Sequence, residues 1–546
     1  MEGVTGAAEP EAAAGGIPPI REEDVRGARL PVFADRDRSL VDLLERSRGY
    51  GDRTYLVCDG RRVGFEEHYR LVSALAVELR DTHGVRPGDR VAILAANGIE
   101  WIATFWATVS IGGIAVAMNS HWAAGEIAYG CAHVRPTLIV ADARRRERLA
   151  EAAAQEPAAR VPVLRIESDV AAPARTAPAG LACPSVRLGE DAPAVVIYTS
   201  GTTGRPKGAV HSHRNMIAAR DFYRYNDAVA AAAGRAPQYD RRYLMTGPLF
   251  HIAALHNIAV PRLDNGETAV IYTGRFDADA VLALIAREGV THWTGVPTMA
   301  HRVLDDANSG AHDLSSLRSF SLGAAPTPPA MRAALRELLP QATAAMVATY
   351  GQTECSTAAT IATPAQLAAN PRSVGSAAVN TQVRVCDESG ATVPGGVEGE
   401  VCVRGAMVML GYWDNDEATA KAIDADGWLH TGDIGVLRDD ELEISSRRTD
   451  LIIRGGENIY PVEIEDALDT HPEVTESIVF GRPSAEYGQE VAAVVVLRPD
   501  TGATDDVLRS HLAGLLAGYK IPSQWTLTTE PLPRNATGKV VRSAFA

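Results

Sequence analysis

Short apolar runs rich in β-branched residues alternate with helical patterns along most of this chain, and this alternation constrains the fold more than any other feature. The predicted strands lie at 90–97, 194–200, 268–273, 291–296, 319–325 and 345–351. Between several of them lie segments such as DADAVLALIAREG, whose apolar residues recur with a period of about 3.6. Strand, helix and strand in succession favour βαβ units and mainly parallel sheets. Functional loops are then expected at the carboxyl ends of the strands.

The pattern changes after about residue 380. VRVCDESGATVPGGVEGEVCVRG combines short strand patterns with Gly and Pro turns, which predicts a small β subdomain. After RRTD a new α+β pattern begins, with a helix at PVEIEDALDTH and strands at ESIVFGR and EVAAVVVLR. We therefore predict an α/β protein with a large domain at 36–446 and a small α+β domain at 450–546. The Ala-, Gly-, Glu- and Pro-rich start predicts a flexible tail over 1–35.

Composition excludes several classes of protein. The formal net charge is −15, which argues against a nucleic-acid binder but allows a small anionic ligand in a local basic pocket. The six cysteines form no C-x-x-C pair, so the sequence favours reduced thiols in a cytoplasmic protein. No apolar run approaches the about 18 residues of a membrane span, and the acidic start is unlike a signal peptide. The sequence indicates nothing about oligomeric state.

The stretch YTSGTTGRPKG at 198–208 follows a predicted strand directly. It does not match the P-loop pattern G-x-x-x-x-G-K-[ST], because Lys207 is followed by Gly208 and not by a hydroxyl residue for Mg²⁺. Its chemistry still suits phosphate, since glycines let backbone N–H groups approach an anion and the hydroxyls and Lys207 add donors and charge. A flexible linker is the alternative, but linkers rarely follow a buried strand with so many hydroxyls.

Two further motifs carry side chains that suit a nucleotide. In ATYGQTE, Tyr350 can stack on a base, Thr353 can bond a phosphate, and Glu354 can hold Mg²⁺ through its hard oxygen ligands. In GWLHTGDIG, the carboxylate of Asp433 can accept both hydroxyls of a ribose. Each motif alone has an ordinary structural explanation, such as a solvated carboxylate at a strand end.

Two more motifs lie in the predicted small domain. RGGENIYPVEIE spans 454–465, and LPRNATGKVVR spans 532–542 and places Lys539 on a loop directly after a glycine. Together, and in this order, all five motifs resemble those of the acyl-activating superfamily of adenylate-forming enzymes. The resemblance covers roughly 38–546, and NSHWAAGEIAYG and GENIYPVEIE make it closest to the branch of fatty-acyl and aryl-acid CoA ligases. It implies a large domain of parallel and mixed sheets with a β subdomain, followed by a small mobile domain.

The resemblance implies an ATP-dependent acid–CoA ligase that works in two half-reactions. A carboxylate attacks the α-phosphorus of ATP and expels pyrophosphate, and the thiol of coenzyme A then attacks the acyl carbon of the adenylate and releases AMP. The implied partners are ATP, Mg²⁺, coenzyme A and a small carboxylic acid. Phosphoryl chemistry of this kind asks the protein for positioning and charge stabilisation more than for covalent catalysis.

The resemblance also gives each matching residue a role. The β- and γ-phosphates would be held by Thr199, Ser200, Gly201, Thr202, Thr203, Gly204 and Lys207. Glu354 would hold Mg²⁺. The adenosine and the α-phosphate would be held by Gly323, Ala324, Ala325, Tyr350, Gly351, Gln352, Thr353, Asp433 and Arg447. Lys539 would reach the substrate carboxylate and the α-phosphate, so that Lys539, Thr199 and Glu354 are the implied catalytic residues.

The small domain is expected to rotate between the half-reactions, one face bringing Lys539 and another bringing Gly455 and Gly456 beside the thiol channel. The sequence departs from the family pattern at Thr449, which stands where a charged hinge residue is usual. A hinge needs tolerant backbone dihedrals more than charge, so rotation is still expected.

The acid pocket is expected around PLFHIAALHN, which resembles the segment lining it in the family. Peptide-synthetase domains generally place an Asp at the position of His251 to pair the ammonium of an amino acid, so His251 predicts an apolar acid. A packed structural histidine is the alternative for this residue. The rest of the pocket is predicted to include Ala254, Trp293, Gly295, Ala324 and Val347.

Two alternatives to the acid–CoA ligase stay open. The same scaffold serves secondary metabolism, where an aryl-acid ligase or a nitrite-dependent diazotase activates its acid without transfer to coenzyme A. A non-catalytic binding module would have lost the lysine or the phosphate loop, and this chain has both.

Overall fold

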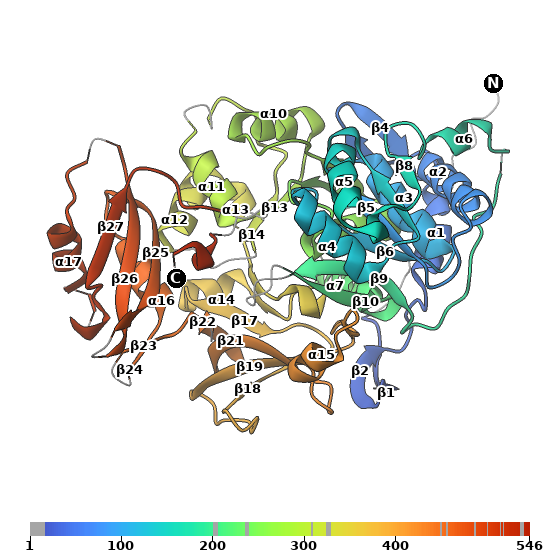
Figure 1. Ribbon diagram of the computed structural model, residues 1–546. Helices are drawn as coiled ribbons and strands as arrows, with labels where there is room; N and C mark the ends of the chain where they lie inside the picture. Colours follow the sequence, from blue (N-terminus) through green and yellow to red (C-terminus); the bar gives the residue numbers. More distant parts are fainter. Residues whose placement is uncertain are drawn as a thin grey trace.

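Figure 1 shows the computed structural model of the chain. The described residues are 17–178, 180–199, 206–234, 240–306, 310–323, 329–344, 346–447, 450–454, 457–484, 487–499, 501–513, 515–516, 518–534 and 540–545. They form three main sheets with helices packed against them, and the last sheet belongs to a separate C-terminal unit, at the left of Figure 1. The predicted α/β fold class, with a β subdomain and an α+β C-terminal unit, is confirmed.

The first sheet is mainly parallel, with antiparallel pairing only where β10 joins β9 and β20 among its described strands. Its strands lie in the order β20 (Gly411–Tyr412), β10 (Lys207–Ser212), β9 (Pro193–Thr199), β6 (Ile114–Ala117), β5 (Arg90–Leu94), β7 (Leu138–Ala141) and β8 (Val163–Arg165). The strands β5, β6 and β7 are almost fully buried and nearly all apolar, as expected for parallel strands covered on both faces.

The second sheet is parallel in one part and antiparallel in the other. A parallel part contains β14 (Ser319–Leu322), β13 (His292–Gly295), β11 (Arg242–Met245), β12 (Thr268–Ile271) and β3 (Thr54–Cys58), edged by β4 (Arg61–Gly64). An antiparallel part contains β18 (Thr381–Cys386), β19 (Glu398–Gly405), β21 (Leu429–Arg438), β22 (Glu441–Arg447), β17 (Ser373–Ala377) and β16 (Thr360–Ala362). The strand β15 (Ala348–Tyr350) joins the two parts, because it is parallel to β14 and antiparallel to β16.

The C-terminal unit has its own sheet and its own apolar core. The strands are β24 (Glu457–Ile459), β23 (Ile452–Arg454), β26 (Gly488–Leu497), β25 (Val474–Ser484) and β27 (Gln524–Thr528). The helices α16 (Pro461–Leu468) and α17 (Asp505–Ala513) contribute Ile464, Leu468, Leu508 and Leu512 to that core.

The helices of the large unit cover and separate its sheets. They are α1 (Leu40–Ser47), α2 (Phe65–Val77), α3 (Ile99–Ser110), α4 (Ala124–Val134), α5 (Ala143–Gln155), α6 (Ala172–Thr176), α7 (His213–Ala232), α8 (Ile252–Ala254), α9 (Val260–Asn265), α10 (Ala278–Glu288), α11 (Pro297–Leu304), α12 (Pro329–Leu338), α13 (Pro340–Thr343), α14 (Pro364–Ala369) and α15 (Asp416–Ala422). The predicted helix at 277–289 is α10, where the Asp277 carboxylate accepts the N–H of Ala280 and Gly289 ends the helix with φ +59°.

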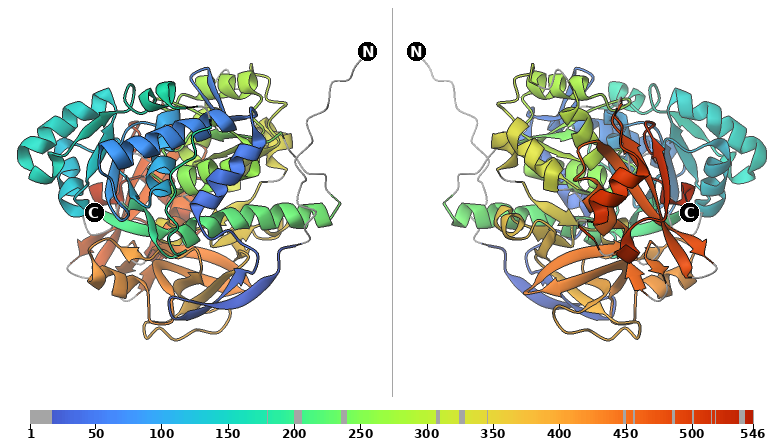
Figure 2. Two further views of the ribbon diagram at one scale, coloured as in Figure 1. Left: turned by 90° about the vertical axis from the view of Figure 1, so that its right-hand side faces the viewer. Right: turned by 90° about the vertical axis from the view of Figure 1, so that its left-hand side faces the viewer.

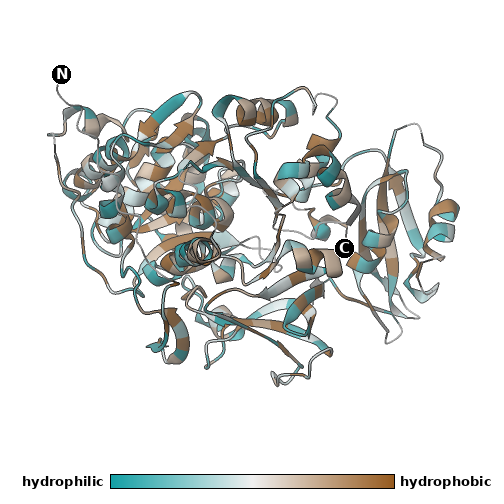
Figure 3. Cartoon of the chain, turned by 180° about the vertical axis from the view of Figure 1, so that it is seen from behind, coloured by the Kyte–Doolittle hydropathy of each residue, from teal (hydrophilic) through white to brown (hydrophobic). Residues whose placement is uncertain are grey.

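Helix α3 lies in the core of the large unit. Every residue of it except Glu100 is buried, and one core cluster contains α3 together with residues of β5, β6 and β9 and of β3, β11 and β12. Both of the first two sheets therefore contribute to one apolar core, which Figure 3 shows as hydrophobic strands and inward helix faces. No described helix has both the length and the apolar character that a membrane crossing requires.

The prediction of a flexible tail over 1–35 is wrong for its second half. The strands β1 (Ile20–Val25) and β2 (Ala28–Phe33) form an antiparallel hairpin, with Arg26 and Gly27 at positive φ in a tight two-residue turn. Val25, Leu30 and Val32 are buried in a cluster with Ala406 of the β subdomain. In Figure 2 the hairpin lies beside that subdomain. The tail prediction rested on the Ala-, Gly-, Glu- and Pro-rich composition of the start of the chain, most of which precedes this hairpin.

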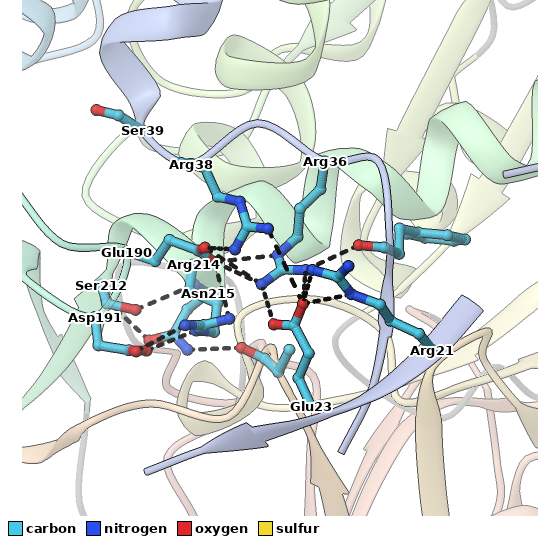
Figure 4. Close-up of polar contacts among 12 residues, drawn as sticks. Arg21, Glu23, Arg36, Arg38, Ser39, Glu190, Asp191, Ser212, Arg214 and Asn215 are labelled. Carbon is cyan, nitrogen blue, oxygen red and sulfur yellow. Dashed lines mark hydrogen bonds and ion pairs between the residues drawn. The ribbon is translucent and has the colours of Figure 1, made fainter. Parts of the chain in front are cut away.

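An ion-pair network also anchors the hairpin to the large unit. The Arg36 side chain is only 4% exposed and bonds to Glu23 of β1 at 2.6 Å and to Glu190 at 2.9 Å. Glu190 in turn pairs with Arg214 of α7 at 2.8 Å. Figure 4 shows the Arg36 guanidinium between the two carboxylates. These contacts identify the hairpin as an integral part of the large unit, and the Arg36 hydrogen bond lowers the pKa of Glu23 to about 2.

Candidate active site

The predicted phosphate loop connects two paired strands. β9 ends at Thr199 and β10 begins at Lys207, and these two half-buried residues lie opposite each other in the antiparallel register. A Cβ on Gly208 would lie 2.7 Å from the Val196 side chain, so the two strands could not pack this closely with a larger residue there. Ser200, Gly201, Thr202, Thr203 and Gly204 lie outside the described residues.

Glu354 lies close to this strand end, and the residue that links the two is Tyr412. The Tyr412 hydroxyl donates to Glu354 Oε1 at 2.7 Å, and the ring centroid of Tyr412 lies 4.9 Å from the ammonium nitrogen of Lys207. Tyr412 reaches this position because β20 pairs with β10, opposite Ala209. Burial and the Glu354 charge raise the pKa of the Tyr412 phenol, so the hydroxyl stays a donor. Sequence reasoning missed this residue, whose only signal is the short GYW at 411–413.

Asp433 and Tyr350 form a second pair of the same kind. The Tyr350 hydroxyl donates to Asp433 Oδ2 at 2.7 Å. Asp433 is only 4% exposed, and its backbone N–H donates to the Thr431 hydroxyl. Burial first and the charge of Asp433 second raise the pKa of the Tyr350 phenol well above its usual value. The pair joins the end of β15 to β21, two elements that are 83 residues apart in the sequence.

The other residues predicted to hold the nucleotide lie along the same segment. Gln352 donates from Nε2 to the Thr431 carbonyl at 3.4 Å, and a Cβ on Gly351 would lie 2.4 Å from the Thr357 carbonyl oxygen. Thr353 begins a short 3₁₀ turn that carries Glu354. Gly323 follows β14 and donates its N–H to the Gly295 carbonyl. Ala324 and Ala325 lie outside the described residues.

Arg447 belongs to the same corner by its backbone. It is the last residue of β22 and lies opposite Asp433 in the register of β21 and β22. The corner of the second sheet therefore brings together Tyr350, Gln352, Asp433 and the backbone of Arg447.

The predicted acid-pocket residues divide into two groups. His251 is half-buried directly before α8, with its ring 4.5 Å from that of Phe250, and Ala254 is buried in the same short helix. Trp293 is only 1% exposed, donates from Nε1 to the Thr246 hydroxyl and packs on Phe320 in the core, so it does not form an open pocket wall. Trp293 lies on the buried face of β13, whereas the next residue, Thr294, is exposed, and this explains the difference.

Of the remaining two predicted pocket residues, Gly295 lies beside Trp293 and Val347 lies just before β15. A Cβ on Gly295 would lie 3.4 Å from the Phe320 ring and 3.5 Å from that of Trp293. Val347 is half-buried and directly precedes β15, which carries Tyr350. Both therefore flank the strand ends from which the nucleotide corner is built.

The C-terminal unit contacts this region through the segment that precedes Lys539. Lys539 itself lies outside the described residues, as do Thr449, Gly455 and Gly456. Arg534 and Val540 form an isolated β-bridge on either side of the undescribed stretch. The Arg534 side chain donates to the Thr298 hydroxyl at 3.1 Å, in the first turn of α11. The face of the C-terminal unit that carries this segment is therefore turned toward the large unit.

Comparison with known proteins agrees with this geometry. The family model for the AMP-binding enzyme matches residues 43–413, and the model for the AMP-binding enzyme C-terminal domain matches residues 463–539. A feruloyl-CoA synthase from Amycolatopsis is 34% identical over 484 residues, covering 88% of this chain and 93% of the relative. An indoleacetate–CoA ligase from Aromatoleum aromaticum is 34% identical over 490 residues, covering 88% and 92%.

Solved structures give the same result. The o-succinylbenzoate CoA synthetase from Bacillus subtilis, in complex with its acyl-adenylate intermediate, aligns with a TM-score of 0.79 at 28% identity over 93% of this chain and 98% of that one. An amide bond synthetase from Marinactinospora thermotolerans aligns with a TM-score of 0.81 at 29% identity over 92% and 98%. The expected family is confirmed: this chain belongs to the AMP-binding enzymes, the adenylate-forming family of AMP-forming acid–CoA ligases, and spans both of its domains.

Proposed function

We propose that this protein adenylates an apolar carboxylic acid with ATP and transfers the acyl group to coenzyme A. The observation that carries the proposal is the pair of buried carboxylates, Glu354 and Asp433, each oriented by a tyrosine hydroxyl at 2.7 Å. Glu354 and the Lys207 ammonium both contact Tyr412, whereas Asp433 lies in β21 and bonds to Tyr350 at the end of β15. A site with a cation and a carboxylate at one end and a second carboxylate at the other suits a nucleoside triphosphate with its metal.

Mg²⁺ fits the surroundings of Glu354. The residue is 9% exposed, Tyr412 occupies Oε1, and Oε2 has no hydrogen bond or ion pair within the described part of the chain. A carboxylate oxygen held in this way is the hard ligand that Mg²⁺ prefers. When bound there, Mg²⁺ would neutralise charge on the β- and γ-phosphates of the substrate.

The chain's own residues would then work as follows. Lys207, Thr199 and the hydroxyls of the loop between them bind and orient the phosphates, while Asp433 accepts the ribose hydroxyls and Tyr350 holds that carboxylate in place. The substrate carboxylate attacks the α-phosphorus and pyrophosphate leaves. Lys539 offsets the negative charge that grows on the α-phosphate and the entering oxygen, which is the kind of preorganised electrostatic contribution that catalyses such steps.

His251 supports an apolar acid as the substrate. No carboxylate stands at this position to pair the ammonium of an amino acid, and an unpaired buried charge would cost several kcal/mol. The feruloyl and indoleacetate names of the relatives support an aromatic acid within this class. The described cysteines are all free thiols, which supports a cytoplasmic location.

An acceptor other than coenzyme A is the second candidate. It is favoured by one observation, the alignment with an amide bond synthetase at a TM-score of 0.81. A wild-type protein that forms adenylate from its best acid but never a thioester would support this candidate and exclude the first.

The test measures the two half-reactions separately in Lys539→Ala. Adenylation, followed by pyrophosphate release, is expected to fall by about 10²–10³-fold, the scale for removing one charge-stabilising donor. Thioester formation from synthetic acyl-AMP and coenzyme A, followed by mass, is expected to stay near the wild-type rate because the small domain has by then turned. Equal loss of both steps would refute this division of labour.

Gly456→Trp is the matched variant for the second step. An indole on this loop would obstruct the path of the thiol, so thioester formation is expected to fall while pyrophosphate release is retained. A screen with aromatic acids, fatty acids, nitrite and α-amino acids identifies the substrate class. Activity with an α-amino acid and with no simple acid would overturn the substrate assignment.

A further inference from the structure

Four residues able to bind a metal share one face of the β subdomain, away from the phosphate end of the site. Glu400 and Cys402 lie two residues apart on β19, so their side chains point to the same face. His430 of β21 is the cross-strand partner of Cys402, and Cys386 of β18 is the partner of Glu400. Strand register alone therefore gathers two thiols, an imidazole and a carboxylate from three neighbouring strands.

The distances within this group match the edges of a metal-centred tetrahedron. His430 Nδ1 lies 3.5 Å from Cys402 Sγ and 3.2 Å from Glu400 Oε2, and the three ligand atoms all lie within 4.8 Å of one another. Ligands at usual Zn²⁺ distances in tetrahedral geometry are separated by about 3.6 Å for sulfur and nitrogen and about 3.4 Å for nitrogen and oxygen. One ring nitrogen also faces both other groups, and it can form a good hydrogen bond with only one of them.

Glu400 and His430 each have a neighbouring group behind the atom that would bind the metal. The other oxygen of Glu400, Oε1, accepts the N–H of Gly432 at 3.1 Å. The other ring nitrogen of His430 faces Asp424 Oδ2 at 3.7 Å, outside hydrogen-bonding distance, and the same oxygen pairs with Arg384 at 3.3 Å. A carboxylate behind a ligating histidine helps to orient the ring. Asp424 is itself held, because its Oδ1 accepts the N–H of Trp428.

We propose that Glu400, Cys402 and His430 form a binding site for a thiophilic divalent cation, Zn²⁺, with Cys386 as the neighbouring thiol that completes the donor set. Cys402 is fully buried and packs with Cys386 and Trp428, whereas His430 and Glu400 are partly exposed, so an ion can enter from their side. No contact of this group depends on the proposed ligase activity, and the two proposals can fail independently.

The site is coupled to the nucleotide corner through one short stretch of β21. His430 is three residues before Asp433, and Glu400 holds the intervening Gly432 by its N–H. A bound ion would fix the Glu400 carboxylate and the His430 ring at once, and with them the turn that presents Asp433. The ion is thus expected to stabilise the large unit and to take no direct part in the chemistry.

The experiment titrates metal-free, reduced full-length protein with Co²⁺ in the presence of excess Mg²⁺. One equivalent of Co²⁺ is expected to give a sulfur-to-cobalt charge-transfer band, and Zn²⁺ is expected to displace it. The band reports a thiolate ligand, so Mg²⁺-type oxygen sites such as Glu354 do not contribute. No band in the wild-type protein would overturn the proposal.

The variants are Cys402→Val, which matches its neighbours Val401 and Val403, and His430→Gln. Each is expected to lower the affinity for Zn²⁺, measured by competition with a chromophoric chelator, by more than about 100-fold, since loss of an outer partner alone costs 10–100-fold. Cys58→Ser, on β3 of the large unit, is the control and is expected to retain the band. A band that persists in Cys402→Val or vanishes in Cys58→Ser would overturn the assignment, as would a native Cys386–Cys402 disulfide with no metal uptake after reduction.

Discussion

The two ends of the proposed nucleotide site each pair a carboxylate with a tyrosine hydroxyl, but in different surroundings. At the nucleoside end Tyr350 donates to Asp433, and at the phosphate end Tyr412 donates to Glu354, both at 2.7 Å. Asp433 is backed by paired strands of one sheet, whereas Glu354 lies on a 3₁₀ turn and meets its tyrosine from the other sheet. The nucleoside end is therefore built within one rigid element, and the phosphate end depends on how the two sheets meet.

Because of this difference, we expect the first end to recognise the ribose and the second end to bind the metal and the phosphates. A carboxylate fixed within a sheet suits recognition of a group that does not change during the reaction, such as a ribose. A carboxylate that shares Tyr412 with the Lys207 ammonium, and has one oxygen still available, suits a metal and phosphates whose charge changes as pyrophosphate leaves. The affinity for AMP reports only on the nucleoside end, because AMP lacks the β- and γ-phosphates.

The largest effect is expected from Asp433→Ala. AMP binding, measured by calorimetry, should weaken by about 30- to 1000-fold, because two charge-assisted hydrogen bonds of the ribose are worth roughly 2–4 kcal/mol. Asp433→Asn keeps the shape but loses the charge, so a smaller loss is expected. Unchanged AMP affinity in Asp433→Ala would remove Asp433 from the nucleoside end.

A matched pair of hydroxyl deletions tests the comparison directly. Tyr350→Phe is expected to weaken AMP binding about 10-fold, because it leaves a buried carboxylate without its donor. Tyr412→Phe is expected to leave AMP binding unchanged and to lower pyrophosphate release from MgATP about 10-fold. The two ends would not be separate if Tyr412→Phe weakened AMP binding as much as Tyr350→Phe does.

The smallest effect concerns the ring of Tyr412 alone. Tyr412→Leu removes both the hydroxyl and the aromatic face near Lys207, so adenylation should fall about two- to fivefold further than in Tyr412→Phe, from a cation–π contact of about 0.5–1 kcal/mol. The rates are compared at saturating acid with varied MgATP. Equal rates in the two variants would mean that Lys207 does not use the ring.

The sequence predicted the residues of the site better than their partners. Tyr350 and Glu354 could be proposed because they lie in a motif that ends an apolar run, and Asp433 because it lies in a Gly-flanked motif. Tyr412 could not, because it is 58 residues from Glu354 and reaches it only through the pairing of β20 with β10. Local patterns carry no information about which distant strands will pair.

The sequence also failed to predict the hairpin at 20–33 and the cluster of metal-binding side chains, because both depend on contacts between distant segments. The hairpin at 20–33 is stabilised by Ala406 and Glu190, which are far away in the sequence, and it directly follows a stretch whose composition resembles a tail. Cys386, Cys402 and His430 have no recognisable metal-binding spacing, and only the register of three strands brings them together. Fold class depended on periodicity that each segment carries by itself, so it could be predicted.

The hydrogen bond between Arg534 and Thr298 has a consequence for the time course of turnover. A hydrogen bond from a charged donor is worth about 1.5 kcal/mol at the low end of its range, so this bond contributes about tenfold to the preference for the resting orientation, beside the contact of the Tyr460 hydroxyl with Glu398. The proposed reorientation of the small domain in every cycle would gain from such a shallow preference, because a deeper one would make departure from the first orientation the slow step. Fluorophores on the two domains should therefore report short dwell times in both orientations, and Thr298→Val should shorten the first.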